Sequence, residues 1–109
     1  MSAWLNLFVA GAFEICFTTM MKLSQGFTKI PYTIGFAICG ICSFYFLNRA
    51  IVAAIPLGTG YAVWTGIGAF GTAIVGMLFF KDPVTPWRVF FLLTLIASIV
   101  GLKLVSPAD

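Results

Sequence analysis

The chain has 109 residues, of which 61% are hydrophobic and 8% are charged, whereas a soluble domain is roughly 25% charged. A water-soluble fold of this length could not bury so much apolar surface, so the composition predicts a protein whose solvent is lipid. The six basic residues are scattered rather than gathered in a stripe, which argues against a nucleic-acid partner. Because the chain has no histidine, it lacks the usual metal ligand, and we expect neither a metal nor another cofactor.

Turn-forming and basic segments divide the chain into four apolar pieces, each near the roughly 20 residues that a helix needs to cross a bilayer. The predicted helices cover residues 4–21, 32–47, 57–80 and 86–105 of a single domain, 1–109. They end in turn at "KLSQGFTK", "NR", "KDPVTP" and "SPAD". Loops this short leave no room for a soluble catalytic domain. We therefore predict an all-α, multi-pass protein of the plasma membrane that is not an enzyme.

Three local motifs could indicate a signal peptide, a redox centre and a nucleotide site, but each of these interpretations has a weak physical basis. Residues 10–12 imitate a signal-peptide cleavage site, but no basic residue precedes the apolar run and another apolar run follows. Cys39 and Cys42 form C-x-x-C inside an apolar stretch, where packing is more plausible than redox chemistry. Residues 66–71 read G-x-G-x-x-G without a preceding strand, so these glycines indicate close packing or a bend rather than a nucleotide site.

Glu14 is the one carboxylate inside a predicted span, since the other acids are Asp82 and Asp109. An acidic side chain at a helix centre costs roughly 2.5–3.5 kcal/mol to insert, and such residues commonly mark an ion or proton pathway. Neutralisation by Lys22 is the alternative, but that residue lies eight positions away and its long side chain favours the interface. Because protonation removes the charge that attracts a cation, one carboxylate can hold a proton or a cation but not easily both. Glu14 is therefore predicted to be the shared site of a proton–cation exchange.

The third span places aromatic side chains on one helical face. Tyr61 and Trp64 are three residues apart and are followed on that face by Thr65 and Gly68. Aromatic rings attract cations, and a phenol or an indole N–H can donate a hydrogen bond to a carboxylate. Tyr61 and Trp64 are therefore candidate substrate-binding residues, although an aromatic packing stripe remains an alternative.

Neighbouring positions on the first two spans complete the candidate site. Phe17 lies on the same face as Glu14 and gives it an apolar wall. On the second span, Gly40, Ser43 and Phe44 share one side, and the Ser43 hydroxyl could orient Glu14 or a substrate. A serine in a membrane helix often bonds only its own backbone, so this signal alone is weak.

The fourth span offers a surface for self-association. Four helices make a bundle too thin to enclose a sizeable substrate, so we expect an oligomer. Thr94, Ala97, Ser98 and Gly101 follow one another on a single face, and small residues at such spacing allow helices to approach closely in lipid. Packing within one chain is an equally good interpretation of this pattern.

Taken together, these residues resemble the small multidrug resistance transporters. The resemblance is carried by "FE" at Glu14, "MKLSQGFT" after it and "PLGTGYAVWTGIGA" at the start of the third span. It implies an antiparallel dimer that exports small organic cations against protons by alternating access. It also implies that Glu14 is the essential carboxylate, that Tyr61 and Trp64 bind substrate, and that Gly66 and Gly68 form a kink used in switching.

The substrate branch is mixed. "WTGIGA", "GLKL" and Ser43 resemble the guanidinium exporters, although those usually carry a tryptophan where this chain has Phe17. "TTMMKLSQGFT" resembles the quaternary-ammonium branch, which usually has a tyrosine at Gly40. We therefore expect both guanidinium-type and hydrophobic quaternary cations as substrates. The alternatives are one subunit of a heterodimeric transporter and a small cation channel.

The distribution of basic residues bears on orientation. Four of them, at positions 22, 29, 81 and 88, fall on one side of the predicted bundle, and those at 49 and 103 fall on the other. Basic residues near span ends favour the cytoplasm, but a bias of four against two is small. A homodimer of opposed copies needs both orientations, and a weak bias permits it.

Overall fold

The structure is a computed structural model that describes residues 2–105. It consists of α1 (Ala3–Leu23), α2 (Ile30–Ala53), α3 (Leu57–Phe79) and α4 (Pro86–Val105), and the described part of the chain contains no strand. All four helices are long and apolar enough to cross a membrane. The predicted all-α membrane fold is confirmed. The segment "SPAD", which was expected to follow the fourth span, lies outside the described residues.

Helix α2 differs most from its predicted range of 32–47. It begins at Ile30, with a proline in its first turn, and continues to Ala53. Asn48 and Arg49 do not end it, because both residue types are compatible with a helix, and the Arg49 guanidinium donates to the Tyr45 hydroxyl one turn earlier at 3.0 Å. The chain leaves the helix only before Pro56, which lacks the N–H that a continuing helix needs.

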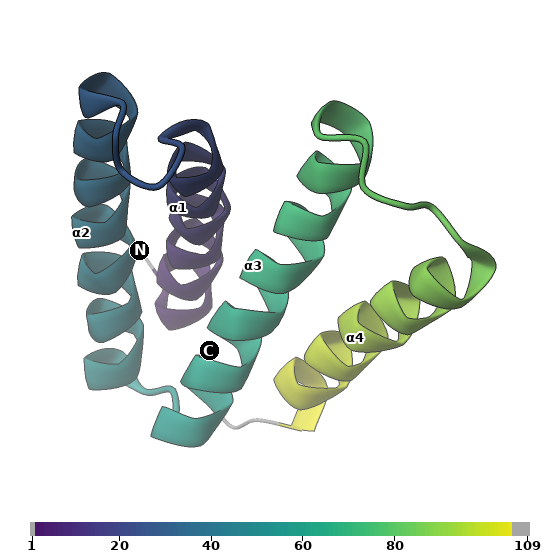
Figure 1. The fold of residues 1–109 in the computed structure, drawn as a ribbon. Coiled ribbons are helices and arrows are strands. Elements are labelled where there is room, and N and C mark those ends of the chain that lie inside the picture. Colours follow the sequence, from purple (N-terminus) through teal and green to yellow (C-terminus); the bar gives the residue numbers. More distant parts are fainter. Residues whose placement is uncertain (1, 106–109) are drawn as a thin grey trace.

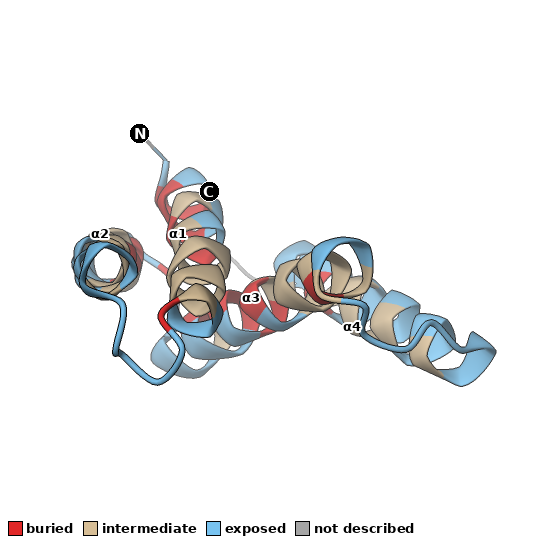
Figure 2. Ribbon diagram, turned by 45° about the horizontal axis from the view of Figure 1, so that its top comes forward, coloured by how far each residue is buried: buried red, intermediate tan, exposed pale blue. Residues whose placement is uncertain are grey.

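The four helices form an open, V-shaped arrangement (Figure 1). α1 lies beside α2, α3 packs mainly on α1, and the backbone of α4 approaches α3 alone. The α1–α2 and α3–α4 connections lie at one end of the molecule, and the α2–α3 connection lies at the other. The buried residues gather where α1, α2 and α3 converge, and much of the outer helix surface is exposed (Figure 2). In a membrane protein such surface faces lipid or a second chain.

Helix α4 makes the least contact with the rest of the chain. Its buried residue is Ile99, whose side chain fills the space above Gly66, where an added methyl group would overlap it. Thr94, Ala97 and Ser98 are exposed, and a side chain added at Gly101 would meet no atom within 4 Å. Within residues 2–105, the small-residue face is therefore not used for packing against the rest of the chain.

Candidate functional site

The Glu14 carboxylate lies directly against α3 at Gly68. A methyl group at position 68 would overlap both the Oε1 atom and the carboxyl carbon of Glu14. Close approach of the two helices is repeated on either side, because side chains at Gly11 and Gly71 would overlap Ile67 and Ile15. The glycines thus let α1 and α3 come together around the acid, as small residues do in membrane helices. α3 runs as an uninterrupted helix through Gly66 and Gly68, and their part in switching stays a prediction.

One oxygen of Glu14 has no partner. Its Oε1 atom is buried and makes no hydrogen bond within residues 2–105. Glu14 lines a cavity of about 370 Å³ between α1 and α3, together with Thr18, Thr65 and Thr72. The Thr72 hydroxyl is also buried and has no hydrogen-bond partner in the described part of the chain, whereas Thr18 donates to the backbone carbonyl of Glu14 at 2.9 Å. An unpartnered carboxylate oxygen beside a polar cavity can accept a proton or a hydrogen bond from a cation.

A buried hydrogen-bond chain joins three helices next to this acid. The indole N–H of Trp64 on α3 donates to the Ser43 hydroxyl on α2 at 2.9 Å. Ser43 in turn donates to the Ala10 carbonyl on α1 at 2.7 Å. In an α-helix that carbonyl also accepts the N–H of the residue four positions later, which is Glu14. Ser43 therefore bonds across helices, and it fixes α1 one turn before the carboxylate.

The aromatic face of α3 has two parts with different surroundings. Trp64 is only 6% exposed and belongs to the core, and its N–H is donated to Ser43 rather than to Glu14. Tyr61 is 59% exposed, with its ring centroid 5.8 Å from that of Trp64. Phe44 of α2 contacts the same indole ring at 5.3 Å. Within one chain, Trp64 is buried in the core and the Tyr61 and Phe44 rings are exposed, and the part of all three in substrate binding stays a prediction.

The remaining candidate residues lie in a different place. Phe17, Gly40 and Phe44 line an apolar groove of about 620 Å³ between α1 and α2. The Phe17 ring packs edge-on against Phe36 at 5.7 Å. The predicted site is therefore divided in a single chain. Glu14 lies in the α1–α3 cavity, and the apolar wall faces the α1–α2 groove.

The cysteines contact each other across helices. The Sγ atoms of Cys16 on α1 and Cys39 on α2 are 2.7 Å apart, and all three cysteines are free. The nearest sulfur to Cys39 is thus not the one in its own C-x-x-C motif. This arrangement agrees with the expectation that the thiols pack between helices.

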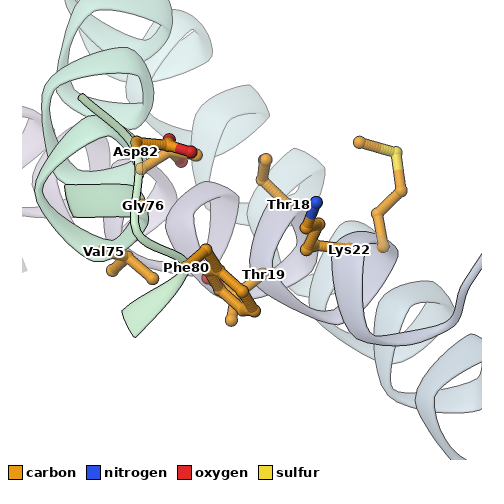
Figure 3. A pocket seen from close by; sticks show the side chains of 9 residues that line it. Thr18, Thr19, Lys22, Val75, Gly76, Phe80 and Asp82 are labelled. Carbon is orange, nitrogen blue, oxygen red and sulfur yellow. The ribbon is translucent and has the colours of Figure 1, made fainter. Parts of the chain in front are cut away.

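Charged residues at one end of the cavity were missed by the sequence analysis. Asp82 and Arg88 line the same space as Glu14, and their side chains form an ion pair of 3.8 Å. Within residues 2–105, Lys22 forms no ion pair with Glu14, and its Nζ atom lies 5.8 Å from the centre of the Phe80 ring. Figure 3 shows Asp82 across an adjoining cavity from Thr18 and Lys22. The four-residue spacing of Glu14, Thr18 and Lys22 was a signal for this polar face.

Comparison with known proteins places the chain in a family. Residues 2–96 match the family model described as Small Multidrug Resistance protein. The chain is 40% identical over 103 residues to the "Probable guanidinium efflux system subunit GdnD" of Bacillus licheniformis, covering 94% of this chain and 98% of that protein. It is 40% identical over 104 residues to a "Guanidinium exporter" of Proteus vulgaris, and 38% identical over 104 residues to one of Yersinia pestis, with 95% of this chain and 99% of each relative covered.

The match extends over almost the whole chain and includes the spans that carry the resemblance described above. It agrees with four helices that are able to cross a membrane. The protein belongs to the small multidrug resistance family, and it is a multi-pass transporter of the inner membrane rather than an enzyme.

Proposed function

We propose that this protein exports small organic cations in exchange for protons, by alternating access, with proton and cation competing for Glu14. Guanidinium-type cations are the first substrate class, and quaternary ammonium and other hydrophobic cations are the second. The relatives named guanidinium exporters support the first class. The apolar groove lined by Phe17, Gly40 and Phe44 supports the second, because it offers room for an alkyl substituent.

The observation that carries the proposal is the buried Oε1 atom of Glu14, which has no hydrogen-bond partner among the residues that the structure describes. A carboxylate that keeps an oxygen unbonded in an apolar bundle is unstable as a bare anion. A proton or a bound cation removes that instability. The two ligands exclude each other because each uses the same negative charge, and this exclusion couples their transport in opposite directions.

An antiparallel homodimer is the assembly that suits this chemistry. A single chain leaves the small-residue face of α4, residues 94, 97, 98 and 101, without a packing partner. It also leaves the Tyr61 and Phe44 rings exposed beside the site. A second copy would cover these surfaces and bring its own Glu14 close to the first.

The test uses purified protein in proteoliposomes with an imposed pH gradient. Guanidinium uptake should follow the gradient in the unaltered protein. It should be lost in Glu14→Gln, which keeps the size of the side chain and removes its charge. Glu14→Asp should keep weak transport with a shifted pH optimum. Because protons compete for the site, the apparent KM for guanidinium should rise as the pH falls in the unaltered protein.

Two outcomes would contradict this proposal. Gradient-driven uptake that persists in Glu14→Gln would remove the shared site. Passive guanidinium current without proton movement would indicate a cation channel instead of an exchanger.

A second candidate is that the chain is one subunit of a heterodimeric exporter. The relative from Bacillus licheniformis is named as an efflux system subunit, which supports this alternative. In that case the protein purified alone would not transport, and activity would appear only when an oppositely oriented partner of the same family is added.

A further inference from the structure

A polar track leads from Glu14 toward the end of the molecule that holds the α3–α4 connection. On α1, Glu14, Thr18 and Lys22 follow one another at four-residue spacing, and Gly68, Thr72 and Gly76 do the same on α3. Two cavities of about 370 and 260 Å³ lie along this track. They share three lining residues, Thr18, Thr72 and Asp82. The space beside Glu14 therefore adjoins the space beside Lys22, and Asp82 borders both.

The backbone after α3 places Asp82 at this position. α3 ends at Phe79, and Lys81 takes a positive φ of 60°, which reverses the chain. The N–H groups of Phe80 and Asp82 both donate to the Gly76 carbonyl at 3.0 Å. The Asp82 carboxylate then lies over Gly76, where any side chain would overlap its Oδ2 atom. A glycine on the helix and a turn after it together bring the acid onto the cavity wall.

The ion pair between Arg88 and the Asp82 carboxylate is weak. Its Nη2 atom is 3.8 Å from Oδ2 of Asp82, and the two side chains are 38% and 45% exposed. A strong guanidinium–carboxylate pair is shorter and uses two parallel hydrogen bonds, whereas an exposed pair at this distance contributes little stability. The Nε atom of Arg88 is buried without a partner within the described residues. The contact is loose enough for another cation to replace it.

The Arg88 side chain ends in a guanidinium group, and relatives of this chain are named guanidinium exporters. We propose that Asp82 is an outer binding position for the transported cation, occupied by Arg88 until a guanidinium-type cation displaces it on the way to Glu14. The inference rests on the proposed function of Glu14. It adds a second carboxylate to the pathway and makes Arg88 an internal competitor.

The other charges at this end of the molecule agree with a competitive role for Arg88. Lys22 lines the same cavity as Asp82, and Lys81 precedes Asp82 in the chain. Lys22 Nζ is directed over the Phe80 ring, so Arg88 is the cation that the structure pairs with the carboxylate. A free guanidinium can meet Asp82 with the two-donor geometry that Arg88 does not reach here.

The experiment compares Asp82→Asn and Arg88→Gln in proteoliposomes, with guanidinium as the probe and initial rates measured over a range of concentrations. The backbone N–H of residue 82 survives the change to asparagine, so the turn keeps its hydrogen bond to Gly76. Arg49→Gln is the matched control, because that guanidinium contacts Tyr45 and no carboxylate in the described chain. Asp82→Glu keeps the charge and should keep the KM of the unaltered protein.

Asp82→Asn should raise the KM for guanidinium by about threefold or more with kcat unchanged, because a local anion raises the substrate concentration near the site. Arg88→Gln should lower the KM, since the competitor is gone. Both differences should shrink at high salt, which screens exposed charges. A merely structural ion pair would instead lower the melting temperature in both variants and raise the KM in neither or in both.

An unchanged KM in Asp82→Asn, or a raised KM in Arg88→Gln, would overturn the inference. If Asp82→Asn fails to fold, Arg88→Gln alone remains decisive, because its KM must fall. Glu14→Gln separates this inference from the proposed function. Loss of transport in Glu14→Gln together with an unchanged KM in Asp82→Asn removes the outer position and leaves the proposed function intact, whereas active Glu14→Gln removes both.

Discussion

Trp64 on α3 and Ser43 on α2 are joined by a buried hydrogen bond of 2.9 Å from the indole N–H to the hydroxyl oxygen. The Ser43 hydroxyl in turn donates a hydrogen bond to the Ala10 carbonyl of α1. Hydrogen bonds of this kind are strong in a low-dielectric interior, and a group left unpaired there is costly. The pair therefore couples the aromatic face of α3 to the backbone turn that carries Glu14.

Ser43→Ala should destabilise the protein by about 1–3 kcal/mol, because it leaves the Trp64 N–H buried and unpaired. Trp64→Phe removes the donor, and in that background Ser43→Ala should cost measurably less. The free energy of unfolding and the guanidinium affinity of the four proteins of this double-mutant cycle test the coupling. Thr33→Ala is the control, since that hydroxyl donates to the carbonyl of Lys29, the residue that caps the start of its own helix. Additive losses would contradict a coupled pair.

Gly68→Ala should abolish or strongly reduce transport. The added methyl group overlaps the Glu14 carboxylate, and overpacking of this kind costs about 1–3 kcal/mol. Gly58→Ala is the matched control on the same helix, because a side chain there meets no atom within 4 Å. Guanidinium uptake and melting temperature should be measured for both. Equal, small effects at the two positions would show that α1 and α3 do not need to approach at Gly68.

Phe17 should widen the range of substrates toward alkylated cations. Its ring borders the apolar groove, and it cannot donate the hydrogen bond that a tryptophan could. Phe17→Trp should therefore lower transport of alkylguanidiniums and quaternary ammoniums more than transport of guanidinium. Phe79→Trp, at an exposed position near the end of α3, should change neither. Strict selectivity of the unaltered protein for unsubstituted guanidinium would refute this prediction.

Gly101→Leu should disrupt the dimer without harming the single chain. A Cβ atom at this position would meet no atom within 4 Å in one chain, so the new side chain starts in open space. A leucine would nevertheless hold apart two α4 helices that meet at their small residues. Size-exclusion chromatography or light scattering in detergent reports the change in mass. Gly58→Leu, equally open in the monomer, should leave the dimer intact. A dimer that survives Gly101→Leu would place the interface elsewhere.

Both orientations of the chain should be present in cells. The structure puts the ends of α1 and α3 on one side with Lys22, Lys29, Lys81 and Arg88, and puts Arg49 and Lys103 at the opposite ends of their helices. The orientation of a membrane protein depends mainly on how many basic residues lie near the span ends on each side. Here the difference, four against two, is small. Tags at the C-terminus should be accessible from both sides of intact cells. A single orientation, combined with no transport by the protein alone, would favour the heterodimeric alternative.

The membrane class, the four spans and the isolated acid could all be predicted from the sequence. Each of these depends on local properties. A span is recognised from the hydropathy of about 20 consecutive residues, and the cost of burying Glu14 follows from its neighbours along one helix. The family resemblance has the same basis, because it is carried by short, continuous motifs around residues 13–28 and 56–69.

The length of α2 was not predictable in the same way. The polar residues at 48 and 49 predict the end of the second span, yet the helix continues to Ala53. A polar residue ends the apolar run but not the helix, because its backbone hydrogen bonds are unaffected. The Arg49 guanidinium donates a hydrogen bond to the Tyr45 hydroxyl, one turn earlier in the same helix.

The partner of each polar side chain depends on how the helices cross, and it could not be predicted from the sequence. Helical periodicity put Trp64 on a face that could meet Glu14, but the crossing of α1, α2 and α3 gives its N–H to Ser43. It also puts Phe17 in a different cavity from the carboxylate. Asp82 is 68 residues from Glu14 in the sequence, and it borders the same cavity because one reversed turn lays it over Gly76. Such contacts depend on how the helices cross and on the geometry of the turns, and neither can be deduced from the hydropathy along a single helix.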